Sequence, residues 1–442
     1  MSNLPTTWVE TNLGTVVPYG ATVKAEPEDL TPDTWVLELE DIEKDTSKVL
    51  QRLTFSERQS KSTKNRFDAG DVLYGKLRPY LNKVTFAEQS GVCTTEIVPI
   101  KPNDAVDGRY LFHWLRHPKF LAYVTEVSHG VNMPRLGTEA GRQAPFVLAP
   151  KNEQKRIADK LDTVLTLVDA VNTRLARVAP ILKRFRQSVL AAATSGRLTE
   201  DWRSGAQANW PTLHAEQVCA KVQSGGTPKG GFLEEGIPFL KVYNIVDQKV
   251  AFDYKPQYVS AEVNATELRK SQVQPGDVLM NIVGPPLGKV AIVPTVHSAW
   301  NINQAITLFR PSEQVSSQWI YFVLCEGAPI REVLNRTKGS VGQVNISLSQ
   351  CRAFELPVPP ADEQAEIARR VETLFAFADR LEARLLNARA ATERLTPALL
   401  SKAFRGELVA QDPNDEPASE LLRRLRQEAP SISAKRGRKS AV

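Results

Sequence analysis

The feature that most constrains this chain is an internal repeat. The segment Asn152-Glu-Gln-Lys-Arg-Ile157 returns as Asp362-Glu-Gln-Ala-Glu-Ile367, 210 residues later. Two further pairs repeat in the same order, namely Ser195-Gly-Arg-Leu198 with Arg405-Gly-Glu-Leu408, and Gly70-Asp-Val-Leu73 with Gly276-Asp-Val-Leu279. Three ordered matches at nearly one spacing are not expected by chance. Because the period is about half of the 442 residues, the repeat predicts two homologous units rather than a solenoid.

Each unit combines two kinds of sequence. Residues 1–150 and 204–356 contain short β-rich runs broken by Gly, Pro, Asn and Asp, with helical patches between them. This mixture predicts two globular domains of the α+β (mixed α/β) class. Residues 151–203 and 357–415 are helical in pattern. Residues 416–442 are interpreted as a basic, disordered tail ending in Lys435-Arg-Gly-Arg-Lys439.

Both helical segments carry a heptad pattern. Their apolar residues are spaced alternately by four and three, which is typical of a coiled-coil seam. The predicted seam residues are Ile157, Leu161, Val164, Val168, Val171 and Leu175 in the first copy, and Ile367, Val371, Leu374, Leu381 and Leu385 in the second. A single seam would fit an amphipathic helix packed on its own domain equally well. Two matched seams favour an antiparallel coiled coil within the chain.

The beginnings of the two helices look alike. Asn152 and Asp362 are predicted N-caps. Glu153 and Glu363 then place negative charge at the positive end of each helix dipole.

The ends of the helices are also marked in both copies. Gly196 and Gly406 are predicted to follow the last helical turns. Pro180 and Pro397 fall inside the helical pattern, so each helix is expected to kink or restart there.

Composition bounds the function. The formal charge of +6 and the sequence pI near 9.0 fit a polyanionic partner. The four cysteines form no C-x-x-C pair, and the five histidines have no metal-ligand spacing, so no metal site is expected. Residues 1–14 lack a basic patch followed by an apolar run, so no signal peptide is expected there, and no apolar run approaches the ~20 residues that a membrane helix needs. We therefore expect a cytoplasmic protein that does not bind a membrane.

No catalytic motif is found. The chain lacks a G-x-x-x-x-G-K-[ST] phosphate loop and an H-E-x-x-H metal motif. The glycine-containing turn Ser224-Gly-Gly-Thr-Pro228 is interpreted as a loop rather than a phosphate cradle. We expect no catalytic residue and no cofactor bound by this chain.

The chain resembles the specificity subunit of type I restriction–modification systems. The resemblance rests on Phe354-Glu-Leu-Pro-Val-Pro-Pro-Ala-Asp-Glu-Gln364 leading into a coiled coil, and on its weaker copy Phe146-Val-Leu-Ala-Pro-Lys-Asn-Glu-Gln154. Leu4-Pro-Thr-Thr-Trp8 and Asn209-Trp-Pro-Thr212 are similar to the starts of the family's domains. The ordered duplication of these motifs is more specific than any one of them.

The resemblance implies a function. Each globular domain would be a target recognition domain that reads one half of a bipartite site in double-stranded DNA. The helices would act as a spacer and as a dock for two methyltransferase (modification) subunits, which restriction/translocase subunits then join. S-adenosylmethionine, ATP and Mg²⁺ are expected on those partners.

The residues that contact DNA are predicted from side-chain chemistry in loops. Lys and Arg neutralise phosphates, and Arg, Asn and Gln also pair with base edges. The candidates are Lys64, Arg66, Lys76, Arg78, Asn82 and Lys83 in the first domain, and Lys241, Asn244, Asn281, Lys289, Asn303 and Gln304 in the second.

Two other functions fit the same sequence. One is a coiled-coil scaffold that binds only protein, and the other is a standalone DNA-binding regulator of the same architecture. A DNA-binding assay with and without a methyltransferase partner separates them.

Overall fold

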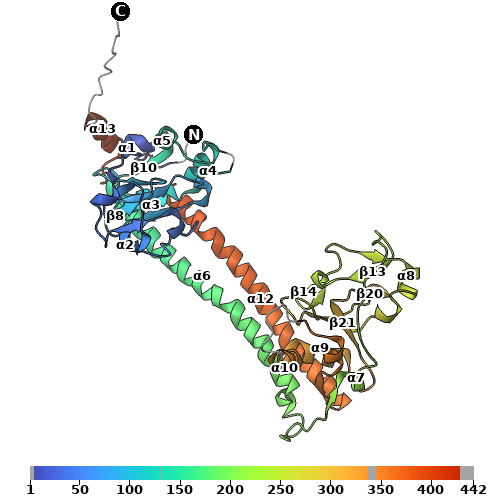
Figure 1. Cartoon of the computed structure of the whole chain (residues 1–442). Coiled ribbons are helices and arrows are strands. Elements are labelled where there is room, and N and C mark those ends of the chain that lie inside the picture. Colours follow the sequence, from blue (N-terminus) through green and yellow to red (C-terminus); the bar gives the residue numbers. More distant parts are fainter. Residues whose placement is uncertain (1–3, 131, 337–344, 429–442) are drawn as a thin grey trace, which may run out of the picture. The chain divides into compact units, whose positions relative to one another are not determined.

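The computed structural model describes residues 4–130, 132–336 and 345–428. The chain divides into two compact units, one formed by residues 1–176 with 387–442 and the other by residues 177–386. Each unit holds one domain of strands and short helices, together with parts of two long helices (Figure 1). These helices are α6 (Lys151–Thr194) and α12 (Ala361–Ala403).

The first domain is built on two small sheets and a strand pair. One sheet has the order β2-β5-β8-β3-β4, the other has the order β7-β6-β9, and β1 pairs with β10. The strands are β1 (Val9–Asn12), β2 (Lys24–Ala25), β3 (Trp35–Leu37), β4 (Leu53–Thr54), β5 (Lys64–Phe67), β6 (Val72–Gly75), β7 (Val84–Phe86), β8 (Gly91–Cys93), β9 (Ile97–Ile100) and β10 (Pro145–Leu148).

The second domain repeats this plan. Its sheets have the orders β16-β13-β20-β17 and β12-β21-β18-β19, and β11 pairs with β22 and β14 with β15. The strands are β11 (Thr212–His214), β12 (Lys221–Ser224), β13 (Ile237–Leu240), β14 (Ile245–Val246), β15 (Lys249–Val250), β16 (Tyr258–Val259), β17 (Gln272–Val273), β18 (Val278–Asn281), β19 (Val290–Ile292), β20 (Trp300–Ile302), β21 (Ile306–Arg310) and β22 (Glu355–Pro357).

Strand direction confirms the duplication. In both domains the parallel pair lies inside a sheet whose other pairs are antiparallel: β3 runs parallel to β8, and β13 runs parallel to β20. The register matches as well, since Leu37 pairs with Cys93 and Leu240 pairs with Ile302. The predicted fold class, with two repeated α+β domains, is confirmed.

Short helices cover the sheets. In the first domain they are α1 (Leu13–Val16), α2 (Phe55–Arg58), α3 (Gly108–Leu115), α4 (Pro118–Glu126) and α5 (Thr138–Arg142). In the second they are α7 (Ala215–Val218), α8 (Ala261–Ala265), α9 (Ser317–Glu326), α10 (Ala328–Arg336) and α11 (Leu348–Arg352). Single 3-10 turns complete the domains; those used below are η2 (Leu39–Asp41) and η6 (Arg269–Ser271).

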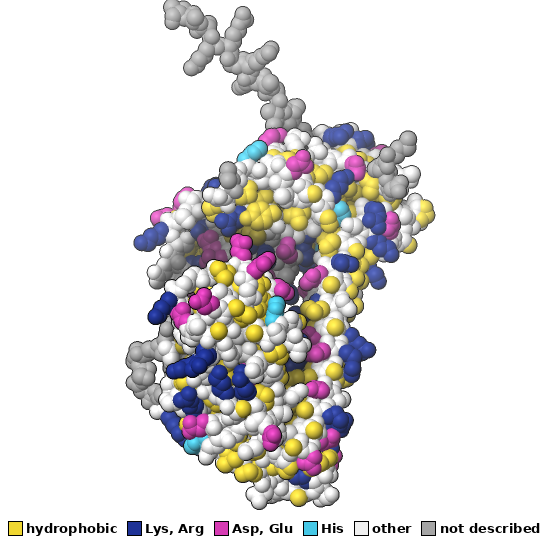
Figure 2. All heavy atoms as spheres, turned by 90° about the vertical axis from the view of Figure 1, so that its right-hand side faces the viewer, with side chains coloured by type: hydrophobic (Ala, Val, Ile, Leu, Met, Phe, Trp, Pro, Cys, Tyr) yellow, Lys and Arg dark blue, Asp and Glu magenta, His cyan; other side chains and the backbone are white. Residues whose placement is uncertain are grey.

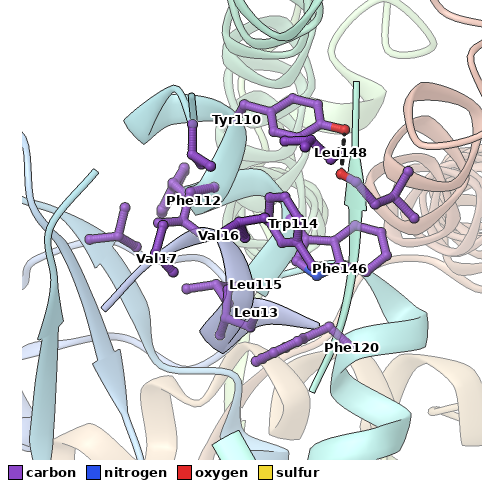
Figure 3. Packing of buried hydrophobic residues seen from close by; sticks show 14 of the residues in the cluster. Leu13, Val16, Val17, Tyr110, Phe112, Trp114, Leu115, Phe120, Phe146 and Leu148 are labelled. Atoms are coloured by element: carbon purple, nitrogen blue, oxygen red, sulfur yellow. Dashed lines mark hydrogen bonds between the residues drawn. The ribbon is translucent and has the colours of Figure 1, made fainter. Parts of the chain in front are cut away.

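The core of the first unit is aromatic. Figure 3 shows Tyr110 and Trp114 of α3 pointing toward Phe146 of β10. The Tyr110 hydroxyl donates a hydrogen bond to the Val147 carbonyl at 2.9 Å, so a buried polar atom is satisfied. In the second unit the Trp319 indole donates in the same way to the Pro357 carbonyl at 2.7 Å. In each domain, a buried aromatic side chain therefore forms a hydrogen bond to the last strand, from α3 to β10 in the first domain and from α9 to β22 in the second.

The long helices begin two residues earlier than the predicted N-caps imply. The carbonyls of Pro150 and Pro360 accept from the N–H groups of Gln154 and Gln364, each at 2.9 Å, and these are the first helical hydrogen bonds. Asn152 and Asp362 therefore lie inside the helices and are not N-caps, which corrects the prediction for both.

The two helices end shortly before the predicted glycines, but they do not restart at the prolines. Gly196 and Gly406 have φ angles of 78° and 76°, the left-handed conformation that closes a helix. Pro180 and Pro397 lie inside continuous helices of 44 and 43 residues, so neither helix restarts there. Loss of one N–H bond is tolerated where the turns on both sides continue.

The two long helices pair with each other, and all but one of the predicted seam residues are buried or partly buried. Within the first unit, the Arg389 guanidinium donates to the Leu175 carbonyl, while Leu161 packs in one cluster with Leu400. As the residue numbers rise along α6, those of the facing residues on α12 fall, so the helices are antiparallel. Val171 is 43% exposed and does not belong to the seam. The buried or partly buried seam residues are Ile157, Leu161, Val164, Val168, Leu175, Ile367, Val371, Leu374, Leu381 and Leu385.

The helix ends also belong to the domain cores. Ile157 and Leu161 pack into the core of the first domain, and Ile367 and Val371 into that of the second. Each helix therefore does both things that its heptad pattern allows: one part packs on its own domain, and another part pairs with the other helix. The first turns pack on their own domain, and the middle turns pair with each other.

Part of the C-terminal segment that was predicted to be disordered is a helix. Helix α13 (Ala418–Glu428) buries Ala418, Leu421 and Leu422 in the core of the first unit, so residues 418–428 are not a disordered tail. The basic run at 435–439 lies outside the described residues. Within the described ranges, none of the helices has both the length and the apolar content that a membrane crossing requires.

Candidate nucleic-acid interface

The Glu-Gln pair at each helix start holds a domain on its helix. Gln154 accepts from the N–H of Asp107 at 2.9 Å and donates to the Ala105 carbonyl at 2.9 Å, which fixes the start of α3. Gln364 accepts from Ser316 at 3.0 Å and donates to the Gln314 carbonyl at 2.7 Å, which fixes α9 in the same way. These glutamines are fully or almost fully buried.

The glutamates of the same motif bind a tryptophan. The Trp8 indole donates to Glu153 at 2.9 Å, and the Trp210 indole donates to Glu363 at 2.9 Å. Glu363 also accepts from Arg203 and forms an ion pair with it. Both carboxylates are about 99% buried, so they tie the start of a domain to the start of a helix, beyond the dipole role predicted for them.

An ionic cluster attaches the first domain to α6. The Nε2 atom of His113 lies 2.8 Å from Asp162, and Nε of Arg109 lies 3.0 Å from the same carboxylate. Burial lowers the pKa of His113 and outweighs the opposite effect of Asp162. Burial also acts to raise the pKa of Asp162, but the hydrogen bond and charge of His113, with Arg109 and Arg116, lower it on balance.

The loop between β6 and β7 carries predicted DNA contacts of the first domain. Lys76, Arg78 and Lys83 are partly exposed. Arg78 and Asn82 have left-handed φ angles of 51° and 48°. The Arg78 N–H donates to the Pro134 carbonyl at 2.7 Å, which holds the loop against a neighbouring segment. Nζ of Lys83 donates to a backbone carbonyl of η2 at 2.6 Å. A fixed loop thus presents Lys76 and Arg78 at the surface.

Four predicted residues are buried, which corrects the prediction for them. Lys64 is 3% exposed, and its Nζ lies 2.9 Å from Glu38 in an ion pair. Asn244 and Asn281 are each 1% exposed, and their side chains bind backbone groups of their own turns. Asn82 is 9% exposed. These side chains stabilise the domains and are not available to DNA. Arg66, two residues after Lys64 on β5, is exposed.

The other second-domain candidates reach the surface. Lys241 is partly exposed, and its Nζ lies 4.2 Å from the ring centroid of Phe232, a cation–π contact. Lys289 and Asn303 are partly exposed, and Gln304 is exposed. On the face of the molecule drawn in Figure 2, basic side chains lie in several separate groups, interleaved with acidic and apolar ones. That face therefore carries no single continuous basic surface.

The two long helices also carry a repeated pair of exposed apolar residues that was not predicted from the sequence. Leu167 is 62% exposed and Phe377 is 49% exposed, and they stand 210 residues apart, at equivalent positions of α6 and α12. Arg174 and Arg384 follow each by seven residues and are also exposed. The signal was present in the sequence, because both residues are apolar positions outside the heptad seam.

The cysteines do not suggest a reactive site. Burial raises the pKa of Cys219, Cys325 and Cys351 to about 12, so these thiols are protonated at neutral pH. Among the described residues, no group of three or more His, Cys, Asp or Glu side chains is arranged to hold a metal ion.

Comparison with known proteins identifies the family. The model of the type I restriction modification DNA specificity domain matches residues 5–179 and again residues 209–388. The chain is 30% identical over 374 residues to the type I restriction enzyme EcoBI specificity subunit of Escherichia coli, covering 78% of this chain and 76% of that protein. It is 23% identical to a putative type I restriction enzyme MjaX specificity subunit of Methanocaldococcus jannaschii, covering 72% of this chain and 74% of that protein.

Solved structures agree on the fold. A chain from a type I restriction–modification system superposes with a TM-score of 0.75 at 21% identity, covering 91% of this chain and 99% of the other. The HsdS subunit of Thermoanaerobacter tengcongensis superposes with a TM-score of 0.60 at 21% identity, covering 91% and 98%. With two matches to one family model on two copies of one fold, the chain belongs to the type I restriction–modification specificity subunits, the DNA-recognition and not the catalytic component of these systems.

Proposed function

We propose that this chain reads a bipartite DNA target, one half-site with each domain, and positions two modification subunits on it. The observation that carries the proposal is the complete duplication of domain, helix and Glu-Gln attachment, because it gives each half its own core and its own recognition surface. Restriction/translocase subunits join the same complex. S-adenosylmethionine, ATP and Mg²⁺ belong to the partner subunits in this proposal.

The repeated surface on the long helices supports two docking sites. An exposed Leu or Phe in water is unfavourable, by ~1.5–3 kcal/mol relative to full burial. Leu167 with Arg174, and Phe377 with Arg384, present the same combination once on each helix. Two copies of one partner fit two equivalent surfaces, which is the stoichiometry proposed for the modification subunit. The four free cysteines fit a reducing compartment, so we keep the cytoplasm as the proposed location.

The experiment is a DNA-binding and methylation assay with defined components. The chain is assayed with and without the modification subunits from its own operon, on duplexes that contain the mapped target. We expect methyl transfer from labelled S-adenosylmethionine only when the partners are present, and salt-dependent DNA binding by the complex. Methyl transfer by this chain alone, or a complex with partners that never binds DNA, contradicts the proposal.

The double variant Lys76→Ala/Arg78→Ala tests the first domain. Each lost phosphate contact reduces the slope of log affinity against log salt by ~0.9. We expect a smaller slope and weaker binding, with the larger effect on duplexes that carry only the first half-site. An unchanged slope means that the β6–β7 loop does not face DNA.

A further inference from the structure

One edge of the second domain gathers three polar loops. Strands β13 and β20 are parallel neighbours, so both end at the same edge of their sheet (Figure 1). Asn303 and Gln304 directly follow β20 at that edge. Asn303 is tied to β13 because its N–H donates to the Leu240 carbonyl at 3.0 Å.

The glycine-containing turn after β12 lies on this edge. Gly226 bridges to Asn303, and its N–H donates to the Ile302 carbonyl at 3.1 Å. A Cβ atom on Gly225 would lie 2.0 Å from the Asn303 carbonyl oxygen, so only glycine permits this close approach. The Thr227 hydroxyl donates to the Gln304 side-chain oxygen. The turn is thus held in place and presents Thr227 beside Gln304.

The third loop adds charge. Leu268 underlies Gly226, and it leads into η6, where Arg269 and Lys270 are exposed. The N–H of Lys229 donates to the Glu267 carboxylate at 2.7 Å, which joins the turn to this loop. None of Lys229, Arg269 and Lys270 has a carboxylate partner within the described residues.

We propose that this edge is the DNA-reading element of the second domain. Lys229, Arg269 and Lys270 bind phosphates, and the exposed Gln304 amide reads a base edge. Amides pair with two atoms of one base, whereas ammonium and guanidinium groups hold the backbone without sequence preference. The Asn303 oxygen Oδ1 is shielded from solvent, so Asn303 positions the loop, and Gln304, whose side chain is exposed, carries the amide that faces outward. The inference rests on the proposed function and assigns it to named residues.

The first test separates phosphate binding from other effects. The variant Lys229→Gln/Lys270→Gln is compared, in the full complex, with Lys249→Gln/Lys255→Gln, which removes two exposed lysines from the same domain. For the first variant we expect a salt slope smaller by about 1.8 and at least about tenfold weaker binding to every duplex, with the modified sequence unchanged. The control variant should bind like wild type. Equal behaviour of the two variants overturns the phosphate assignment.

The second test addresses base reading. Gln304→Ala is compared with Thr227→Val, because both remove the Thr227–Gln304 hydrogen bond but only the first removes the amide. We expect Gln304→Ala to lose about tenfold or more discrimination at one position of one half-site, and Thr227→Val to keep the wild-type preference. Modified sites mapped across a genome give the preference. If Gln304→Ala modifies the same sequences as wild type, the amide does not read bases. A wild-type complex that binds no DNA would instead refute the proposed function.

Discussion

At the scale of single residues, the most informative side chains are those that bind the backbone inside the domains. The side chains of Gln154 and Gln364 each form hydrogen bonds that hold the start of a long helix against the domain that precedes it. Asn244 and Asn281 close turns in the same way. In a sequence, such amides look like those that contact DNA. Burial separates the two roles, and burial is set by residues far away in the chain.

The first prediction concerns Gln364. Replacing it by Ala removes the hydrogen-bond partner of the Ser316 N–H and of the Gln314 and Pro359 carbonyls, in a partly buried to buried position. We expect a loss of about 2–4 kcal/mol in the unfolding free energy of the second unit, because each unsatisfied group costs ~1–3 kcal/mol. Denaturant unfolding measures it. Gln314→Ala, an exposed neighbour, is the control, and equal losses in the two variants would contradict this role.

The second prediction concerns pH. Burial lowers the pKa of His113 below 6.5, and that of His117 to about 4. Below pH 6.5 the unfolded chain binds protons that the folded chain does not, so the first unit should lose stability as the pH falls from 7 to 5. Asp162, whose pKa is lowered, loses its contribution only at lower pH. Thermal unfolding across this range measures the effect.

The control for the pH prediction comes from the repeat. The second unit has the buried Phe322 at the position that corresponds to His113. His113→Phe should therefore flatten the pH dependence of the first unit, apart from the share of His117. A variant whose unfolding temperature still falls with pH as steeply as that of wild type would assign the effect to other groups.

At the scale of elements, each long helix has three different surfaces. Its first turns complete a domain core, its middle turns form the seam, and large apolar side chains remain exposed, among them Leu167 on α6 and Phe377 on α12. The spacing of four and three residues accounts for the seam alone. Val171 continues that spacing and is nevertheless 43% exposed.

The third prediction tests docking on the helices. Leu167→Asp should abolish binding of one modification subunit, and Phe377→Asp that of the other, because each places a charge in a surface proposed to become buried. Thr166→Asp and Ala376→Asp, one residue away on a different face, are the controls. Native mass spectrometry of the purified complex gives the stoichiometry. Two bound subunits in the double variant Leu167→Asp/Phe377→Asp would rule these surfaces out.

At the scale of the whole molecule, the duplicated plan predicts a spacer of adjustable length. Seven residues of helix span ~10 Å, or about three base pairs of DNA. Leu161 and Val371 lie in domain cores, so the heptads that contain them are unsuitable for deletion. Residues 172–178 and 387–393 are more suitable for deletion, because Leu175 and Arg389 are in contact and the two heptads therefore face each other.

The fourth prediction follows from that choice. Deleting both heptads together should preserve the seam and shorten the gap between half-sites by up to about three base pairs, with both half-site sequences unchanged. Mapping the modified sites across a genome measures the gap. Deleting only 172–178 is the control, since it mismatches the helices and should impair folding. A folded double deletion that keeps the original gap would mean that the helices do not set the spacing.

The sequence by itself determined the duplication, the fold class, the heptad seam and the family, because periodicity and repeated motifs are local properties of the chain. It did not determine which polar loop residues face solvent. Lys64 and Lys76 look alike in sequence, but one is buried in an ion pair with Glu38 and the other lies at the surface. That difference, like the gathering of Gly225, Arg269 and Gln304 at one edge, depends on which strands become neighbours. Strand neighbours are set by contacts between distant residues, so only the tertiary structure decided them.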